Sequence, residues 1–267
     1  MHPIERLRYV ARASGAPAEV LVQETARALA SFDDDPQGLV TACRRIVSRQ
    51  PASGPLVWFA ARVLTASDPR SEIWEAAGAV AADPTAAELA HALPDRATVV
   101  VLGWPSTIDD TLARRGDLEV LVVDALGEGS GLVRRLLSAD VEAVDVPQAG
   151  LGAAVAAGDL VLLEASAIGP GEALAVSGSL AAAAVARHLG VPVWLVGGVG
   201  RLLPQRMWEG LRSRAVRAAE PWDADDEVLP LELVDRLVGP CGPEPVEQGL
   251  RRTDCPVAPE LFKGDVF

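Results

Sequence analysis

Four short loops carry side chains that could do chemistry, and each of them follows an apolar run. The loops span residues 103–109, 124–131, 147–152 and 164–179. They supply five serine hydroxyls, at Ser106, Ser130, Ser166, Ser177 and Ser179. A serine attacks a substrate only when a neighbouring base removes its proton, and the sequence contains no Gly-x-Ser-x-Gly elbow. We expect these hydroxyls to contact a ligand or to cap helices, with capping favoured for Ser106 and Ser177.

Carboxylates near the ends of the predicted strands are the candidates for acid–base chemistry. They are Asp109, Asp124, Asp159 and Glu164. A carboxyl group can act as a base near neutral pH when burial raises its pKa. No plausible nucleophile stands beside any of the histidines, so we expect no catalytic role for His2, His91 or His188.

Motifs for metals and nucleotide cofactors are missing, and we expect neither. The sequence contains no P-loop, no His-Glu-x-x-His and no zinc spacing. Residues 197–200, Gly-Gly-Val-Gly, follow an apolar run, but the last glycine of the dinucleotide fingerprint Gly-x-Gly-x-x-Gly is missing. The three cysteines form no Cys-x-x-Cys pair and are predicted to be free thiols, with Cys43 on an apolar helical face.

One local cluster of positive charge lies in the C-terminal part. It consists of Arg201, Arg206, Arg212, Arg214 and Arg217. Such a run is typical of a solvated face that pairs with carboxylates, and the alternative is a contact with an anion or a partner.

The overall charge opposes nucleic acids and anionic membranes as general partners. The 267 residues carry a net charge of −13, and an acidic surface repels phosphate groups. No apolar run approaches the roughly 20 residues of a membrane helix, and the first residues show no signal-peptide core. We therefore expect a cytoplasmic protein. Arginine almost replaces lysine, and alanine is abundant, which indicates a GC-rich bacterial genome.

The first 92 residues are predicted to form a helical N-terminal subdomain. Apolar residues recur at spacings of three and four in five segments, at 4–13, 18–32, 38–48, 55–66 and 71–83. Turn residues of the Pro, Gly, Asp and Ser types separate these segments.

Residues 93–267 are predicted to form an α/β domain. Short apolar runs lie at 98–102, 119–123, 141–146, 160–164 and 192–197. Helical segments alternate with them near 106–115, 129–138, 150–157 and 177–189. This alternation is typical of a Rossmann-like, mostly parallel sheet with helices on both faces, whose ligands lie beyond the carboxyl ends of the strands. In the tail we expect a helix over 204–220 and a short helix over 230–239.

Several of these segments, in this order, resemble one protein family. It contains methylthioribose-1-phosphate isomerase, ribose-1,5-bisphosphate isomerase, and the α, β and δ regulatory subunits of the exchange factor for eukaryotic initiation factor two. The similar segments are 14–29, 49–64, 99–108, 122–136, 159–196 and 227–239. They correspond to the family's Arg-Gly-Ala-Pro-Ala, Arg-Pro-Thr-Ala-Val-Asn-Leu, Thr-His-Cys, Glu-Ser-Arg-Pro, Gly-Ala-Asp…Asn-Lys-x-Gly-Thr and Pro-Leu-x-Leu-Val segments. The resemblance implies a helical domain before a Rossmann-like domain, and a homodimer paired through the latter.

The residues that do chemistry in the isomerases are replaced here. In that family a Cys and an Asp transfer the protons, and their positions correspond to Pro105 and Ser166. The family's phosphate-binding arginines correspond to Ser14, Gln50 (or Arg49 after a shift of one residue) and Leu126, and its Asn-Lys pair corresponds to Ala175–Val176. Backbone-shaping residues remain, namely Gly15, Ala16, Pro17, Gly171, Gly178 and Ser179.

These replacements imply a non-catalytic, initiation-factor-2B-like protein that serves binding, regulation or assembly. No catalytic residue is expected, because isomerisation needs an acid and a base beside the substrate. The candidate pocket residues are Gly15, Ser106, Ser166, Gly171, Ser177, Gly178 and Ser179. Backbone N–H groups at the last three could hold an anion weakly at a helix start.

Two alternatives stay open at this point. One is a sugar-phosphate aldose–ketose isomerase in which Glu164 substitutes for the missing base. The other is translation control, by analogy with the regulatory subunits. The partners implied are a second copy of the chain, an unidentified protein, and a weakly bound small molecule or sugar phosphate.

Overall fold

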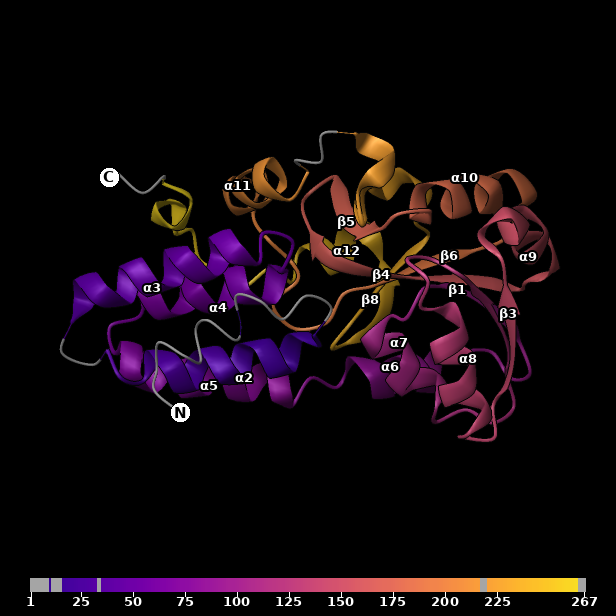
Figure 1. Cartoon of the computed structure of the whole chain (residues 1–267), viewed down its shortest axis with the longest axis horizontal. Helices are drawn as coiled ribbons and strands as arrows, with labels where there is room; N and C mark the ends of the chain where they lie inside the picture. The colour runs from indigo at the N-terminus through magenta and orange to yellow at the C-terminus, as the bar shows by residue number, and fades with distance from the viewer. Residues whose placement is uncertain (1–9, 11–15, 33–34, 217–219, 264–267) are drawn as a thin grey trace.

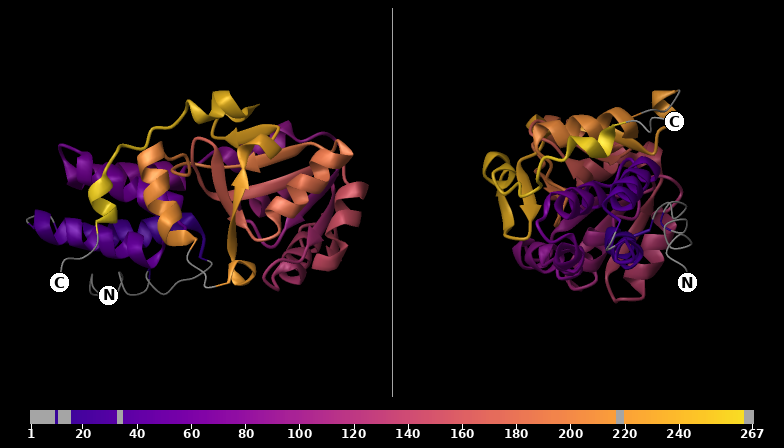
Figure 2. Two further views of the ribbon diagram at one scale, coloured as in Figure 1. Left: turned by 90° about the horizontal axis from the view of Figure 1, so that it is seen from above. Right: turned by 90° about the vertical axis from the view of Figure 1, so that its left-hand side faces the viewer.

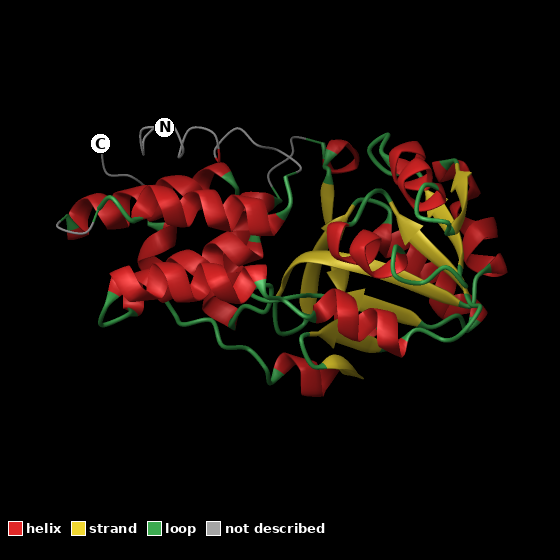
Figure 3. Ribbon diagram, turned by 90° about the horizontal axis from the view of Figure 1, so that it is seen from below, coloured by secondary structure: helices red, strands yellow, loops and turns green. Residues whose placement is uncertain are grey.

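The computed structural model describes Val10 and residues 16–32, 35–216 and 220–263, and it confirms the predicted α/β architecture. Helices of the N-terminal part gather at one end of the molecule, and the sheet with its own helices forms the other end (Figure 1). The same separation is seen from below in Figure 3. Apart from Val10, the helix predicted over 4–13 lies outside the described residues.

Three N-terminal helices begin at a capping side chain with a proline in the first turn. Asp35 accepts a hydrogen bond from the Gly38 N–H at 2.8 Å, and Ser53 and Asp68 cap the next two helices in the same way. Such caps satisfy N–H groups that have no partner inside the helix. The helices of this part are α2 (Ala18–Leu29), α3 (Pro36–Arg49), α4 (Gly54–Thr65) and α5 (Pro69–Ala81).

Helix α4 lies at the centre of the helical core, because it is apolar on nearly every side. Its Trp58 and Phe59 are fully buried. The same core takes Trp208 from α11 (Gln205–Ala215) and Leu261 from the 3-10 turn η4 (Pro259–Phe262). Figure 2 shows the C-terminal chain, in yellow, returning from the sheet to the helical part. The boundary near residue 92 stays a prediction.

The central sheet is parallel over most of its width. Its strands are β1 (Thr98–Leu102), β2 (Glu119–Val123), β3 (Glu142–Val146), β4 (Leu160–Ile168), β6 (Val193–Val196), β8 (Arg236–Gly239) and β9 (Gly242–Pro245). They lie in the order β3-β2-β1-β4-β6-β8-β9, and β9 alone joins this path in the antiparallel sense. The five predicted strands are β1, β2, β3, β4 and β6.

Helices cover both faces of this sheet, as predicted. Successive residues of β1 enter opposite cores, since Val99 and Val101 face one side while Val100 and Leu102 face the other. The first side is covered by α6 (Thr85–Ala92), α7 (Ser106–Leu112) and α8 (Gly129–Leu137). The second is covered by α9 (Leu151–Ala157) and α10 (Ser179–Leu189). A last short helix, α12 (Val246–Leu250), packs beside β8. No described helix is long and apolar enough to cross a membrane.

Two predictions for the second half of the chain are wrong. The loop expected over 164–179 is largely a hairpin, because β4 continues to Ile168 and β5 (Glu172–Val176) returns antiparallel beside it. Strand β7 (Asp226–Pro230) extends this sheet on the far side of β5. The helix expected over 230–239 is a 3-10 turn, η3 (Leu231–Leu233), followed by β8, whose backbone pairs with β6 instead.

Candidate functional site

A cavity of about 460 Å³ lies between the helical part and the carboxyl ends of the sheet strands. Helix α2 and the α3–α4 connection form one wall, through Pro17 and Gln50. The other wall comes from the ends of β1 and β4, the start of α7 and the start of β7. This is the place where ligands of such sheets bind.

Four positions that the resemblance aligns with the isomerases' functional residues line this cavity. Pro105, Ser166, Gln50 and Leu126 all line it. Arg49, the alternative for Gln50, is exposed and outside the lining. Every one of these four positions therefore presents an uncharged side chain to the cavity.

The predicted pocket residues divide into two groups. Ser106, Ser166 and the candidate base Glu164 line the cavity. Four others do not line it, namely Gly171, Ser177, Gly178 and Ser179. Gly15 lies outside the described residues.

Glu164 is held in place from several directions. Its Oε2 accepts hydrogen bonds from the N–H groups of Thr107 at 2.8 Å and Ile108 at 3.2 Å, in the first turn of α7. Its Oε1 accepts from the hydroxyls of Ser106 and Thr107 and pairs with Arg201 at 2.8 Å. The Glu164 side chain is 9% exposed and that of Arg201 is 10% exposed. Glu164 thus caps α7, the role expected of Ser106, and its lone pairs are already in use.

Arg201 joins this network from the Gly197–Gly200 loop after β6. Besides Glu164, its guanidinium donates to the Ala165 carbonyl at 2.5 Å. The loop is fixed by Asp83, whose Oδ2 accepts from the Val199 N–H at 2.7 Å while Oδ1 accepts from Thr85. The glycine-rich loop is therefore bonded to the protein's own carboxylate.

A second carboxylate, which the sequence prediction missed, enters the cavity from β7. The Ser166 hydroxyl donates to Oδ1 of Asp226 at 3.4 Å. Burial raises the pKa of Asp226 to about 6, against the lowering effect of the Ser166 hydroxyl, and the charge of Asp225 adds to the rise. Both aspartates line the cavity. The signal available in the sequence was the acidic run just before the 227–239 segment, which only the β5–β7 pairing brings to Ser166.

The N-terminus of α10 is already occupied by a carboxylate. Oε1 of Glu227 accepts from the N–H groups of Gly178 at 2.7 Å and Leu180 at 2.8 Å. The Ser177 N–H donates to the Asp225 carbonyl and its hydroxyl to the Ala224 carbonyl, so Ser177 does not cap the helix. An anion at this turn would have to displace Glu227.

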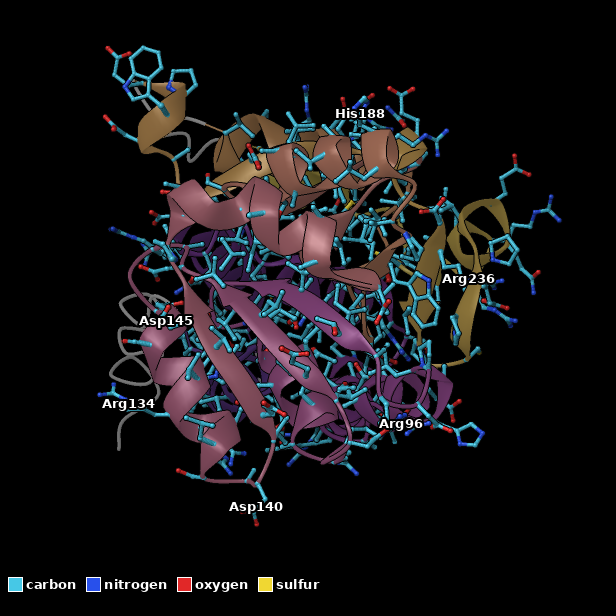
Figure 4. All side chains as sticks on the ribbon, turned by 90° about the vertical axis from the view of Figure 1, so that its right-hand side faces the viewer. Arg96, Arg134, Asp140, Asp145, His188 and Arg236 are labelled. Carbon is cyan, nitrogen blue, oxygen red and sulfur yellow. The ribbon has the colours of Figure 1, made fainter. Side chains whose placement is uncertain are left out.

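The other predicted acid–base candidates serve the fold outside the cavity. Asp109 is buried and accepts from the Trp104 indole at 2.9 Å, Asp124 accepts from the Gly129 N–H at 2.9 Å, and Asp159 accepts from the Thr98 N–H at 2.9 Å. His188 is exposed on α10 (Figure 4).

The predicted arginine cluster is divided between interior and surface. Arg201 is buried, Arg206 is exposed, and Arg212 pairs with Glu172 at 3.1 Å. Arg214 stacks over the Phe262 ring, 4.9 Å from its centre. The four described arginines therefore form no common anion site.

Charge in the cavity is predominantly negative. Four carboxylates line it, and Arg201 is the only cation of the described lining. No group of three metal-ligating side chains occurs among the described residues. The cavity can bind a ligand by hydroxyl, carboxylate and apolar contacts, but its one guanidinium, that of Arg201, is already paired with Glu164.

The helical part, the mostly parallel sheet and the cavity at the strand ends together define an α/β fold of the initiation-factor-2B type. Solved structures with this fold match the chain. The Pyrococcus horikoshii OT3 translation initiation factor eIF-2B has a TM-score of 0.80 at 15% identity, covering 93% of this chain and 98% of that one. For eIF2B beta from Chaetomium thermophilum the values are 0.72 and 18%, with 97% and 91% covered. The tetrameric eIF2B-beta2-delta2 complex of C. thermophilum gives 0.71 and 18%, with 93% of each chain covered.

The expected resemblance is thus confirmed at the level of the fold. Identities of 15–18% show the fold and leave activity to be argued from the site. No protein-family model matches the sequence, and the search of curated proteins found no match.

Proposed function

We propose that this chain is a non-catalytic protein with the initiation-factor-2B fold, and that it serves binding, regulation or assembly. One observation carries the proposal: Pro105 and Ser166, the residues that the resemblance aligns with the isomerases' acid–base pair, line the cavity and cannot shuttle a proton unaided. The substitute base expected at that edge, Glu164, is bonded to helix α7 and to Arg201.

Loss of phosphate binding supports the same proposal. A bound phosphate needs arginine, lysine or several free N–H groups. The cavity offers one arginine, whose charge Glu164 offsets, and the amides at the start of α10 are bonded to Glu227. Losing about three charged contacts at roughly 1.5–3 kcal/mol each weakens a phosphosugar by several orders of magnitude.

The test is an assay of isomerisation with methylthioribose-1-phosphate and with ribose-1,5-bisphosphate. We expect no turnover above the uncatalysed rate at enzyme concentrations comparable with the substrate. Turnover that disappears in a variant of a cavity residue would overturn the proposal. Addition of either substrate is also expected to leave the melting temperature unchanged, since a ligand of the folded state raises it.

The second candidate function is a sugar-phosphate isomerase whose acid–base residues have been replaced by others. The environment of Asp226 is the observation that favours it. Its raised pKa and its place beside Ser166 suit a general acid or base. This candidate predicts turnover that Asp226→Asn removes, and it fails if the unsubstituted chain shows none.

We further propose that the chain is a homodimer in the cytoplasm of a bacterium, and that an unidentified protein is a further partner in regulation or translation control. Twofold homo-oligomers are the commonest soluble assemblies. Light scattering on the purified chain tests this, and a mass equal to that of one chain would rule out the homodimer.

A further inference from the structure

Three of the carboxylates that line the cavity have no cation beside them among the described residues. Glu164 is matched by Arg201, but Glu128, Asp225 and Asp226 form no ion pair with a described side chain. Asp226 is mostly buried, and among the described residues its one side-chain hydrogen bond comes from the neutral Ser166 hydroxyl. Glu128 and Asp225 are exposed, whereas Asp226 is only partly exposed and follows Asp225 directly in the chain. A bound positive charge would relieve the repulsion between these two neighbouring aspartates.

An aromatic ring lies on the wall of the same cavity. The Trp104 side chain belongs to a residue that is 42% exposed, although its indole N–H is bonded to Asp109. This bond and the packing of the ring against Gly131 hold the indole in one orientation. The remaining wall is apolar, with Leu102, Pro105 and Val176. A fixed indole ring on the wall of a cavity that also contains carboxylates offers an apolar surface to the body of an organic cation.

From the cavity, its unmatched carboxylates and the fixed indole we propose that this site binds a small organic cation, an amine with an apolar body. The inference rests on the proposed binding function and names the chemical class of its ligand. The ammonium group would lie against Asp226 and Ser166, and the apolar part against Trp104 and Leu102. A phosphosugar carries the opposite charge and is disfavoured at the same place.

Three small molecules with carbon chains of equal length provide the test, namely diaminooctane, octanediol and octanedioate. They differ only in ending with ammonium, hydroxyl or carboxylate groups. In calorimetric titrations of the full chain at neutral pH, we expect saturable binding of the diamine, weaker or no binding of the diol, and none of the dicarboxylate. Equal or tighter binding of octanedioate would overturn the proposal, as would the absence of diamine binding.

Two variants distinguish diamine binding in the cavity from diamine binding to the acidic surface in general. Asp226→Asn is expected to weaken diamine binding about tenfold or more, the usual effect of losing one charge-assisted hydrogen bond. The matched control is Asp223→Asn, because Asp223 is exposed in the same segment but does not line the cavity. If both variants weaken binding equally, the diamine is bound by bulk surface charge and the site is refuted.

A second variant tests the aromatic contact without removing a charge. Trp104→Leu keeps an apolar side chain but removes the ring against which the apolar body lies, so we expect severalfold weaker binding of the diamine and a parallel loss of any octanediol binding. This result is independent of the isomerase assay. Turnover of a phosphosugar would defeat the proposed function alone, whereas missing diamine binding would defeat the ligand class alone.

Discussion

The carboxylate of Glu164 and the guanidinium of Arg201 form an ion pair of 2.8 Å at the wall of the cavity, with both side chains about nine-tenths buried. Glu164 belongs to β4 and caps α7, while Arg201 belongs to the loop after β6 and also binds the Ala165 carbonyl. The pair thus connects three elements at the carboxyl edge of the sheet. A catalytic base was expected at the position of Glu164. Because its bonds hold these elements together, we interpret the pair as structural.

Removing one partner of this pair should be costly. Arg201→Met leaves the Glu164 carboxylate buried without a cation, and breaking a buried pair in this way costs about 3–5 kcal/mol. We expect denaturant unfolding to show a loss in this range. A loss below about 1 kcal/mol would show that solvent reaches the pair and that it does not hold the three elements together.

The double variant Glu164→Gln/Arg201→Met provides the control. Glutamine keeps an oxygen that accepts from the Thr107 and Ile108 N–H groups, and no unpaired charge remains. We expect it to recover at least half of the stability lost in Arg201→Met, since the penalty comes from the uncompensated charge. No recovery would mean that lost packing of Arg201, not charge, causes the effect.

Asp83 and Gly198 should be coupled in stability. A Cβ added at Gly198 would lie 2.1 Å from Oδ2 of Asp83, which Val199 holds by a hydrogen bond of 2.7 Å. Gly198→Ala and Asp83→Ala are each expected to cost about 1–3 kcal/mol, by overpacking and by lost hydrogen bonds respectively. In the Asp83→Ala background the alanine at 198 meets no carboxylate, so its cost should nearly vanish. Additive costs in unfolding experiments would contradict this contact.

Asp226 should make the stability of the fold depend on pH in the acid range. Its ordinary pKa of 3.8 is raised to about 6 by burial, so the folded chain takes up this proton before the unfolded chain does. Stability from this group is therefore smallest above pH 6 and grows as the pH falls through about 6 towards 4.

Asp226→Asn isolates this contribution from the other carboxylates. The stability of the unsubstituted chain relative to this variant is expected to rise by about 1–3 kcal/mol between neutral pH and about pH 4. Asp225 faces the same site and remains in both proteins, so its effect largely cancels. Parallel stability–pH curves for the two proteins would show that Asp226 is not buried in the folded chain.

The parts of this fold that local sequence pattern determines were predictable. Strands such as β1 and β2 are buried on both faces and appear as unbroken apolar runs. Strand β5 was not predicted, because its Glu-Ala-Leu-Ala-Val sequence contains residues of low β-propensity and follows a Gly-Pro-Gly turn. Its identity as a strand comes from pairing with β4 and β7, which no local window contains.

The site was predictable to the same extent. Pro105, Ser166 and Glu164 lie near the ends of predicted strands, so their meeting at one edge follows from a parallel sheet. Asp226 and Arg201 reach the cavity through β7 and through the loop after β6, and neither position follows from spacing along the chain. The sequence also could not show that Glu164, not Ser106, caps α7, because that bond spans 57 residues.

Thiol reactivity offers a last test of the burial on which these arguments depend. Burial raises the pKa of Cys43 and of Cys255 to about 12, so neither forms the reactive thiolate near neutral pH, while Cys241 is exposed. A disulfide reagent should therefore modify one thiol rapidly in the native chain and all three in denaturant. Cys241→Ser should abolish the rapid phase and leave the denatured total at two. Fast modification of a second thiol would show that the helical core, which contains Cys43 and Cys255 together with residues of α4 and α11, opens on the timescale of labelling.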